Sequence, residues 1–351
     1  MPTVIQDLYV QGGQSIWLNG FRKNWLRNGQ LKDYIKNGLH GLVYDYQSIL
    51  EVIQDTDAYD RQIKLFHVPD QNPFELFDAL QREDIRAIAD LFAPIYHVTE
   101  GIDGLVSVPV DPRLSYDSKL LISEALRLFK HIRRPNILFG IPATEEGVSA
   151  AVELLSKGIN VHFTHVYSIH SYERAFGAYM EGVRQWVETG AMAKSVVSTV
   201  SIGFDAVHSP LSAYIASDSS VGLHLKDYNG DIGFCLCAEI YKQYKTNLNS
   251  ASFQRLRDKG AHPQKPMWGP VDIRSVGSTE MRTVENLIAH DTISTLSDGG
   301  FEAFIDEGSI KKRLTEHDDY LENIFDILKE KYPNSDSALR RISISKIAQE
   351  Q

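Results

Sequence analysis

The residues that could do acid–base chemistry centre on a short apolar segment, Val161 to Tyr167, which carries His162 and Thr164. Residues two apart in a strand share one face, so this imidazole and this hydroxyl would lie side by side. A histidine changes charge between about pH 5 and 8, which suits a general acid or base. Neighbouring hydroxyls could equally do no more than satisfy its ring nitrogens, and both interpretations stay open.

Asp111, in the sequence VDPRL, lies two residues beyond Pro109 and would share its face. It could pair with His162 as an acid and a base. The favoured alternative is a turn-capping aspartate before Pro112, partnered by Arg113. Asp45 and His162 are too few and too poorly spaced for a metal site, so we expect neither a metal nor a cofactor.

The elements that must position these residues are short apolar runs that alternate with amphipathic helices. The central run, Pro135–Thr144, reads PNILFGIPAT and suits a strand buried on both faces. Thr144 then caps a helix with carboxylates in its first turn. Strands are predicted at 15–18, 39–49 (with its turn), 104–110, 137–141, 161–167, 196–202, 266–269 and 292–295.

Eight strand–helix units in 351 residues predict an α/β fold, a (β/α)₈ barrel with extra N-terminal helices. A doubly wound sheet is the competing architecture. Helices are expected at 22–37, 72–80, 83–99, 118–132, 145–157, 171–189, 230–246, 250–257 and 318–332. No linker or repeat divides the chain, so residues 1–351 are interpreted as one domain with a partly free tail at 333–351.

The composition excludes several classes of protein. A net charge of −10 and a pI near 5.6 disfavour a nucleic-acid or anionic-membrane partner. The start has no signal-like apolar segment and no stretch is long enough to cross a membrane, which favours a cytoplasmic protein. Cys235 and Cys237, the two cysteines, are interpreted as reduced packing residues.

Several segments together resemble the longer bacterial transaldolases, mainly over residues 10–210. They are SIWLNG at 15–20, AYDRQI at 58–63, GLVSVPVDPRLSYD at 104–117, RPNILFGIPATEEG at 134–147, KGINVHFTHVYS at 157–168, SYERAFGAYMEGV at 171–183 and SVVSTVSIGFD at 195–205. The resemblance implies a transaldolase-like barrel. Barrels of this family commonly associate, so a homo-oligomer is compatible with it.

The chemistry that the resemblance implies requires charged groups that this chain lacks at the matching positions. In the family a lysine forms an imine with a ketose phosphate, an aspartate and a glutamate move protons, and arginines hold the phosphate. These positions fall on Asn19 (aspartate), Pro109 (glutamate), Gly140 (lysine) and Gly203 (arginine). Glycine cannot form an imine, so we predict that the protein is not a working transaldolase.

Other positions of the implied site have changed in character. The small polar residues after the second strand become Tyr44 and Tyr46, and the asparagine beside Thr164 becomes His162. Ser198 keeps a small hydroxyl. Trp268 would complete an aromatic wall if the seventh strand is placed correctly, and Arg274 is a weak substitute for a phosphate-binding arginine. His165 has the opposite parity to Thr164 and is expected to pack beneath the helices.

We therefore expect an enzyme with a remade, imine-free site for a small substrate that is less charged and more apolar or aromatic. His162, Tyr44, Tyr46 and Asp111 are the candidate catalytic residues. Candidate substrate-binding residues are Asn19, Gly140, Thr164, Ser198 and Trp268. A lyase, isomerase or cyclase step in specialised metabolism fits such a pocket. The alternatives are a non-catalytic ligand- or partner-binding relative, or an aldolase with a relocated lysine, for which Lys226 is preferred over Lys194.

Overall fold

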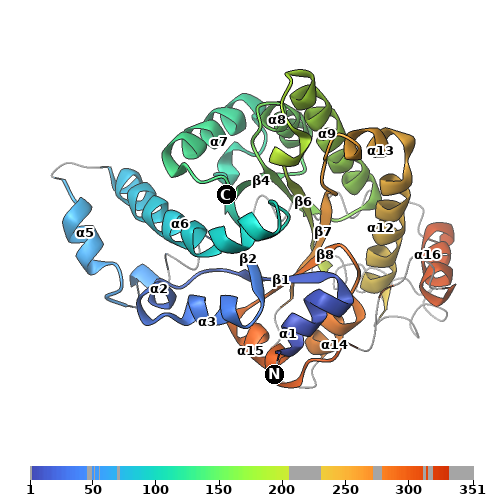
Figure 1. Ribbon diagram of the computed structural model, residues 1–351, viewed down its shortest axis with the longest axis horizontal. Coiled ribbons are helices and arrows are strands. Elements are labelled where there is room, and N and C mark those ends of the chain that lie inside the picture. Colours follow the sequence, from blue (N-terminus) through green and yellow to red (C-terminus); the bar gives the residue numbers. More distant parts are fainter. Residues whose placement is uncertain are drawn as a thin grey trace.

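A closed barrel of eight parallel strands forms the centre of the computed structural model (Figure 1). The structure describes residues 2–45, 50, 52–54, 56–68, 72–204, 231–271, 279–310, 314 and 319–331. Each strand pairs with the next along the chain, and β1 closes the barrel against β8. The strands are β1 (Gln14–Asn19), β2 (Leu39–Val43), β3 (Leu105–Pro109), β4 (Ile137–Pro142), β5 (Val161–Val166), β6 (Ser198–Ile202), β7 (Lys265–Val271) and β8 (Thr292–Leu296).

Helices surround the barrel, as expected for strands joined by crossover connections. The longer ones are α6 (Pro73–Val98), α7 (Ser118–Ile132), α8 (Glu145–Leu155), α9 (Ile169–Glu188), α12 (Ile232–Asn249), α15 (Asp298–Glu307) and α16 (Asp319–Lys331). Shorter ones are α1 (Val4–Asp7), η1 (Leu8–Gly12), α2 (Asn24–Asn28), α3 (Gln30–Lys36), α5 (Asp60–Phe66), η2 (Pro112–Leu114), η3 (Ala193–Ser195), α13 (Ala251–Arg257) and α14 (Thr279–Asn286). None of these described helices is long and apolar enough to span a bilayer.

Two separate clusters of apolar side chains divide the buried core. The smaller cluster lies inside the barrel and includes Trp17, Leu138 and Met267. The larger cluster lies between the barrel and the helices and contains the alternate strand residues, such as Phe139 and Val200. This alternation identifies which residues of each strand face inward.

Trp17 lies inside the barrel beside β2. Its indole ring lies against Gly41, where any Cβ atom would collide with the ring. The glycine therefore permits the close approach of an aromatic side chain that is fully buried.

The predicted barrel and all eight predicted strand positions are confirmed. The apolar run of β4 is buried on both faces, as expected for a strand covered by helices. Thr144 also caps α8 as predicted, since its hydroxyl accepts the Gly147 amide at 2.9 Å. The helix expected at 22–37 is instead two short helices that meet at Gly29, whose φ is 84°. The two helices expected at 72–80 and 83–99 are one continuous helix, α6.

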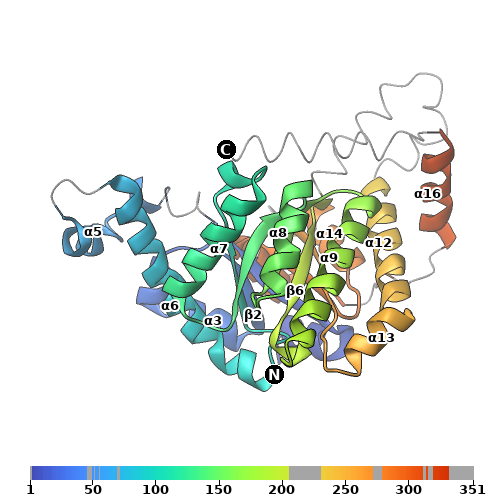
Figure 2. The same cartoon turned by 90° about the horizontal axis from the view of Figure 1, so that it is seen from above.

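The outermost helices lie at opposite ends of the molecule (Figure 2). At one end α5 packs against α6, and at the other α16 packs against α12. The sequence-based helix assignments omit α14 and α15, which follow β7 and β8.

Candidate functional site

The candidate site lies at the carboxyl ends of β3, β4, β5 and β6. The strand register places Pro109 beside Gly140, and Gly140 beside His162. These residues share the inward parity of Leu138 in the interior cluster. Because active sites of such barrels lie at this end of the strands, this row is where substrate chemistry is expected.

His162 is held between two serine hydroxyls inside the barrel. Its Nδ1 lies 2.7 Å from Ser107 Oγ on β3, and its Nε2 lies 2.6 Å from Ser201 Oγ on β6. The imidazole is buried, so both ring nitrogens have their hydrogen-bonding needs met by these hydroxyls. This geometry corresponds to the interpretation in which hydroxyls satisfy the ring.

The surroundings of His162 favour the neutral imidazole. Its pKa is lowered to about 3, chiefly because burial disfavours the charged ring and secondly because His165 lies close enough to repel that charge. A histidine that stays neutral at physiological pH donates one hydrogen bond and accepts another. Such a histidine can polarise a neutral group through a hydrogen bond or relay a proton between neutral groups, but it supplies no positive charge.

Thr164 and His165 occupy an irregularity in β5. Phe163 pairs with Val200 and Val166 pairs with Ile202, so the two intervening residues of β5 face one residue of β6, Ser201. This extra residue is a β-bulge, which breaks strand alternation. The prediction that His165 packs beneath the helices is therefore wrong: its Nδ1 lies 2.9 Å from Thr164 Oγ1, and its side chain is partly exposed.

Gly140 permits β3 and β4 to approach closely. A Cβ atom at Gly140 would lie 3.2 Å from Pro109 Cα, which is tighter than an ordinary van der Waals contact. The space around position 140 therefore suits a residue without a side chain. Gly140 lies between Pro109 on β3 and His162 on β5.

Asp111 has the capping role that was the favoured interpretation. Its Oδ1 accepts the Arg113 amide at 2.9 Å, and both its carboxylate oxygens accept the Arg113 Nε at 3.0 Å. Hydrogen bonding from Arg113 lowers the pKa of this carboxyl. The predicted pair with His162 does not form, because Arg113 holds the carboxylate and the two serines hold the imidazole.

Two of the predicted aromatic residues, Tyr44 and Trp268, do not line the barrel. Tyr44 follows inward-facing Val43 and therefore points outward, where its ring stacks on Phe21 with centroids 5.9 Å apart. Trp268 alternates with inward-facing Met267 and is buried in the outer cluster. Their predicted places at the substrate are corrected by the observed strand parity, and Tyr46 lies outside the described residues.

Of the polar candidates, Asn19 shares the inward parity of Trp17 at the end of β1, whereas Ser198 points outward. Ser198 Oγ accepts Gln264 Nε2 at 2.9 Å, and the same amide approaches the Ala175 carbonyl of α9. The inward hydroxyl on β6 is Ser201. Ser107 and Ser201 were not predicted from the sequence. An even spacing from inward-facing Pro109 and Val197 would have placed both serines on the inward face.

Of the two lysines considered as replacements for the imine-forming lysine, Lys194 lies far from the candidate site and Lys226 is not among the described residues. Lys194 precedes β6 and lies 3.3 Å from Glu100, at the opposite end of the barrel as predicted. Lys265 faces the interior, but its Nζ lies 3.4 Å from the Asp103 carboxylate. Lys226 and Arg274 lie outside the described residues.

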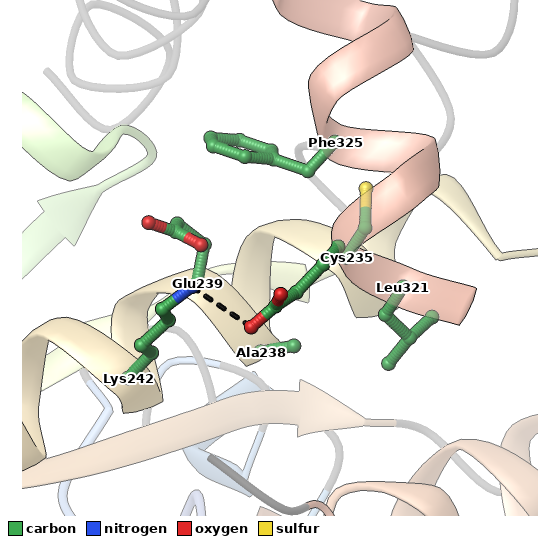
Figure 3. A pocket seen from close by; sticks show the side chains of 7 residues that line it. Cys235, Ala238, Glu239, Lys242, Leu321 and Phe325 are labelled. Carbon is green, nitrogen blue, oxygen red and sulfur yellow. Dashed lines mark hydrogen bonds and ion pairs between the residues drawn. The ribbon is translucent and has the colours of Figure 1, made fainter. Parts of the chain in front are cut away.

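Among the described side chains, no three His, Cys, Asp or Glu residues gather closely enough to hold a metal ion. A hollow elsewhere, between α12 and α16, is bordered by Cys235 and Phe325 and bridged by an ion pair of 2.8 Å between Lys242 and Glu322 (Figure 3). Cys235 is a buried thiol that forms no disulfide, and burial raises its pKa to about 12. This hollow is a seam between helices and has no chemistry in common with the barrel site.

Comparison with known families matches residues 46–344 to the family described as transaldolase/fructose-6-phosphate aldolase. The chain belongs to this family. A transaldolase of Trichodesmium erythraeum (strain IMS101) is 28% identical over 325 residues, which are 91% of this chain and 86% of the relative. A transaldolase of Thermobifida fusca (strain YX) is 29% identical over 314 residues, which are 88% and 84% of the two chains. The transaldolase-family match agrees with the closed barrel.

Proposed function

We propose that this transaldolase-family protein is an enzyme that works without an imine on a substrate less charged, and more apolar or aromatic, than a sugar phosphate. The observation that carries the proposal is His162, which is kept neutral between Ser107 and Ser201 beside Gly140. A lyase, isomerase or cyclase step fits a site that moves protons or polarises the substrate without a fixed charge. Specialised metabolism is the setting in which such a reaction is expected.

The same residues explain why imine chemistry is not proposed. The sequence resemblance matches Gly140 to the family's lysine, and glycine has no amine to attack a ketone. The close approach of Pro109 leaves little room for a side chain at that position. A neutral imidazole and two hydroxyls also offer an ionised phosphate no cationic partner, such as an arginine that binds it through two parallel hydrogen bonds.

A neutral hydrogen-bond network can nevertheless assist a reaction. A histidine kept neutral by its surroundings can polarise a carbonyl through a hydrogen bond, as in the established barrel isomerase mechanism. Here the group within reach of the mouth is the partly exposed Ser201, with His162 behind it. The proposed role of His162 is therefore to orient the Ser201 hydroxyl, and the proposed substrate offers that hydroxyl a neutral oxygen.

A thermal-shift screen of the full chain tests this proposal. One half of the panel holds fructose 6-phosphate and other sugar phosphates, and the other holds neutral aromatic, terpenoid and polyketide-like compounds. A compound that binds only the native state raises the melting temperature by mass action. Stabilisation by the neutral compounds is expected, whereas stabilisation by sugar phosphates alone would overturn the proposed substrate class.

The second candidate function is ligand or partner binding without catalysis. It is favoured by Trp17, which fills barrel space beside Gly41. This candidate predicts binding without turnover, so a neutral compound that stabilises the protein but returns unchanged after prolonged incubation would support it. The third candidate, an aldolase with a relocated lysine such as Lys226, predicts a lysine adduct after borohydride reduction.

A further inference from the structure

The bulge in β5 changes the direction of one side chain at the barrel mouth. Two residues, Thr164 and His165, stand opposite the single residue Ser201 on β6. Bulges are frequent beside active sites, where they re-aim a side chain. Without the extra residue, His165 would alternate with Thr164 and face the helices.

The contacts of His165 place its ring on the Thr164 side of the strand. Nδ1 lies 2.9 Å from Thr164 Oγ1, and the ring meets the Tyr167 ring edge-on with centroids 6.1 Å apart. Its charge is close enough to His162 to disfavour protonation there. The hydrogen bond between Nδ1 and Thr164 Oγ1 fixes the orientation of the ring.

The backbone of His165 is strained in a way that the other strands do not share. Its φ is 60°, in the left-handed region that disfavours residues with a side chain. The other described non-glycine residues with positive φ are Glu100, Arg133 and Asp291, which lie at turns or a helix end. Strain of this kind persists where the surrounding structure enforces it, and such positions concentrate at functional sites.

We infer that His165 is a catalytic residue, the group that exchanges a proton with the substrate at the mouth, and that Thr164 fixes its ring. This inference rests on the proposed function and assigns different tasks to the two histidines. Buried His162 orients Ser201, and partly exposed His165 faces the substrate. Two titratable groups in contrasting environments are the usual arrangement for such a division.

Alkylation by phenacyl bromide, a small neutral aromatic ketone, tests the inference without knowledge of the substrate. A ring nitrogen attacks the methylene carbon, the C–N bond forms as bromide leaves, and the ring proton passes to solvent. Peptide mass mapping of the full chain should show the first label on His165. The His165→Asn variant, whose residue tolerates the same backbone, should lose that label.

Two comparisons make the result decisive. Arg133→Gly relieves a positive φ at the end of α7 and should keep the wild-type labelling. Bromoacetate, which is anionic, should label His165 more slowly than phenacyl bromide does. First labelling at another histidine, or equal labelling of the His165→Asn variant, would overturn the inference.

A stability readout separates strain from chemistry. His165→Gly should melt about 1–2 °C above His165→Ala, because only glycine relieves the positive φ. A lower melting temperature for the glycine variant would contradict an enforced conformation. These outcomes are independent of the ligand screen: a silent screen with specific His165 labelling would remove the proposed substrate class and keep His165 at the mouth.

Discussion

Nε2 of His162 lies 2.6 Å from Oγ of Ser201, and this contact joins a fully buried imidazole on β5 to a partly exposed hydroxyl on β6. Ser107 holds the other ring nitrogen at 2.7 Å. The three residues form a continuous chain of hydrogen bonds across the inside of the barrel.

Replacing His162 with asparagine should flatten the acid side of the stability profile. The pKa of His162 is about 3 in the folded protein, below its ordinary value of about 6.5, so between these values the unfolded chain binds more protons. Stability should therefore rise with pH across this window, by up to about 1.4 kcal/mol per unit from this group, and level off above it. Urea unfolding of both proteins at several pH values measures the difference.

The matched control is His170→Asn on α9, whose side chain is exposed. It should keep the wild-type slope. An unchanged slope in His162→Asn would mean that the imidazole is not buried neutral.

Ser198→Ala and Ser201→Ala should separate the two faces of β6. Each should lower the free energy of unfolding by about 1–2 kcal/mol, because each leaves a buried partner, Gln264 or His162, with a missing hydrogen bond. Only Ser201→Ala should also reduce the melting-temperature rise produced by a compound that stabilises the wild type. A loss of response in Ser198→Ala would place that serine at the ligand after all.

Asp84 should be among the most sensitive charged positions, since it is fully buried in α6. It forms an ion pair with Lys23 and accepts the Tyr59 hydroxyl at 2.5 Å. Asp84→Ala leaves a buried cation without its partner and should cost about 3–5 kcal/mol, measured by urea unfolding. Tyr59→Phe, which removes one hydrogen bond, should cost only about 1.5–3 kcal/mol.

The double variant Lys23→Met, Asp84→Leu provides the control for this ion pair. It removes both charges and should be much more stable than Asp84→Ala. Equal losses in the two would argue that volume, and not the unpaired charge, sets the cost.

Gly140→Ala should destabilise the protein, although alanine is usually favoured over glycine. The new methyl group would lie 3.2 Å from the Pro109 backbone, so β3 and β4 must separate, at a cost of about 1–3 kcal/mol. Gly177→Ala is the control on α9, because nothing lies within 4 Å of its Cβ position. That variant should gain about 0.5–1 kcal/mol, and thermal melting compares the two. Tolerance of alanine at 140 would show that the strands can give way.

Sequence patterns were sufficient for the barrel because its strands depend on apolar runs, and PNILFGIPAT contains one with a clear stop and helix cap. The strands up to β6 were also supported by the family resemblance over residues 10–210, whereas β7 and β8 were placed on a weaker signal. Helix boundaries were less certain, since Gly29 separates two helices in one polar segment while α6 continues through residues 81–82.

The site was harder to predict because a shift of one residue in strand register turns a side chain from the inside of the barrel to the outside. Tyr44, Ser198 and Trp268 are on the strands or turns predicted for them, but on the outward face. A bulge then reversed the parity expected for His165, and no glycine in the sequence marks its positive φ. The hydrophobic pattern predicts where a strand lies, whereas the face on which each side chain lies depends on the exact pairing with the neighbouring strands.

Borohydride reduction in the presence of fructose 6-phosphate shows whether any lysine of this protein forms an imine with a sugar phosphate. The full chain is incubated with the sugar phosphate, reduced, and weighed by intact-mass spectrometry, with a working transaldolase as the positive control. For an imine-free site we expect an unmodified mass, while the control gains a reduced adduct. A reduced adduct on any lysine of this chain, located by peptide mapping, would contradict an imine-free site and would identify the relocated amine.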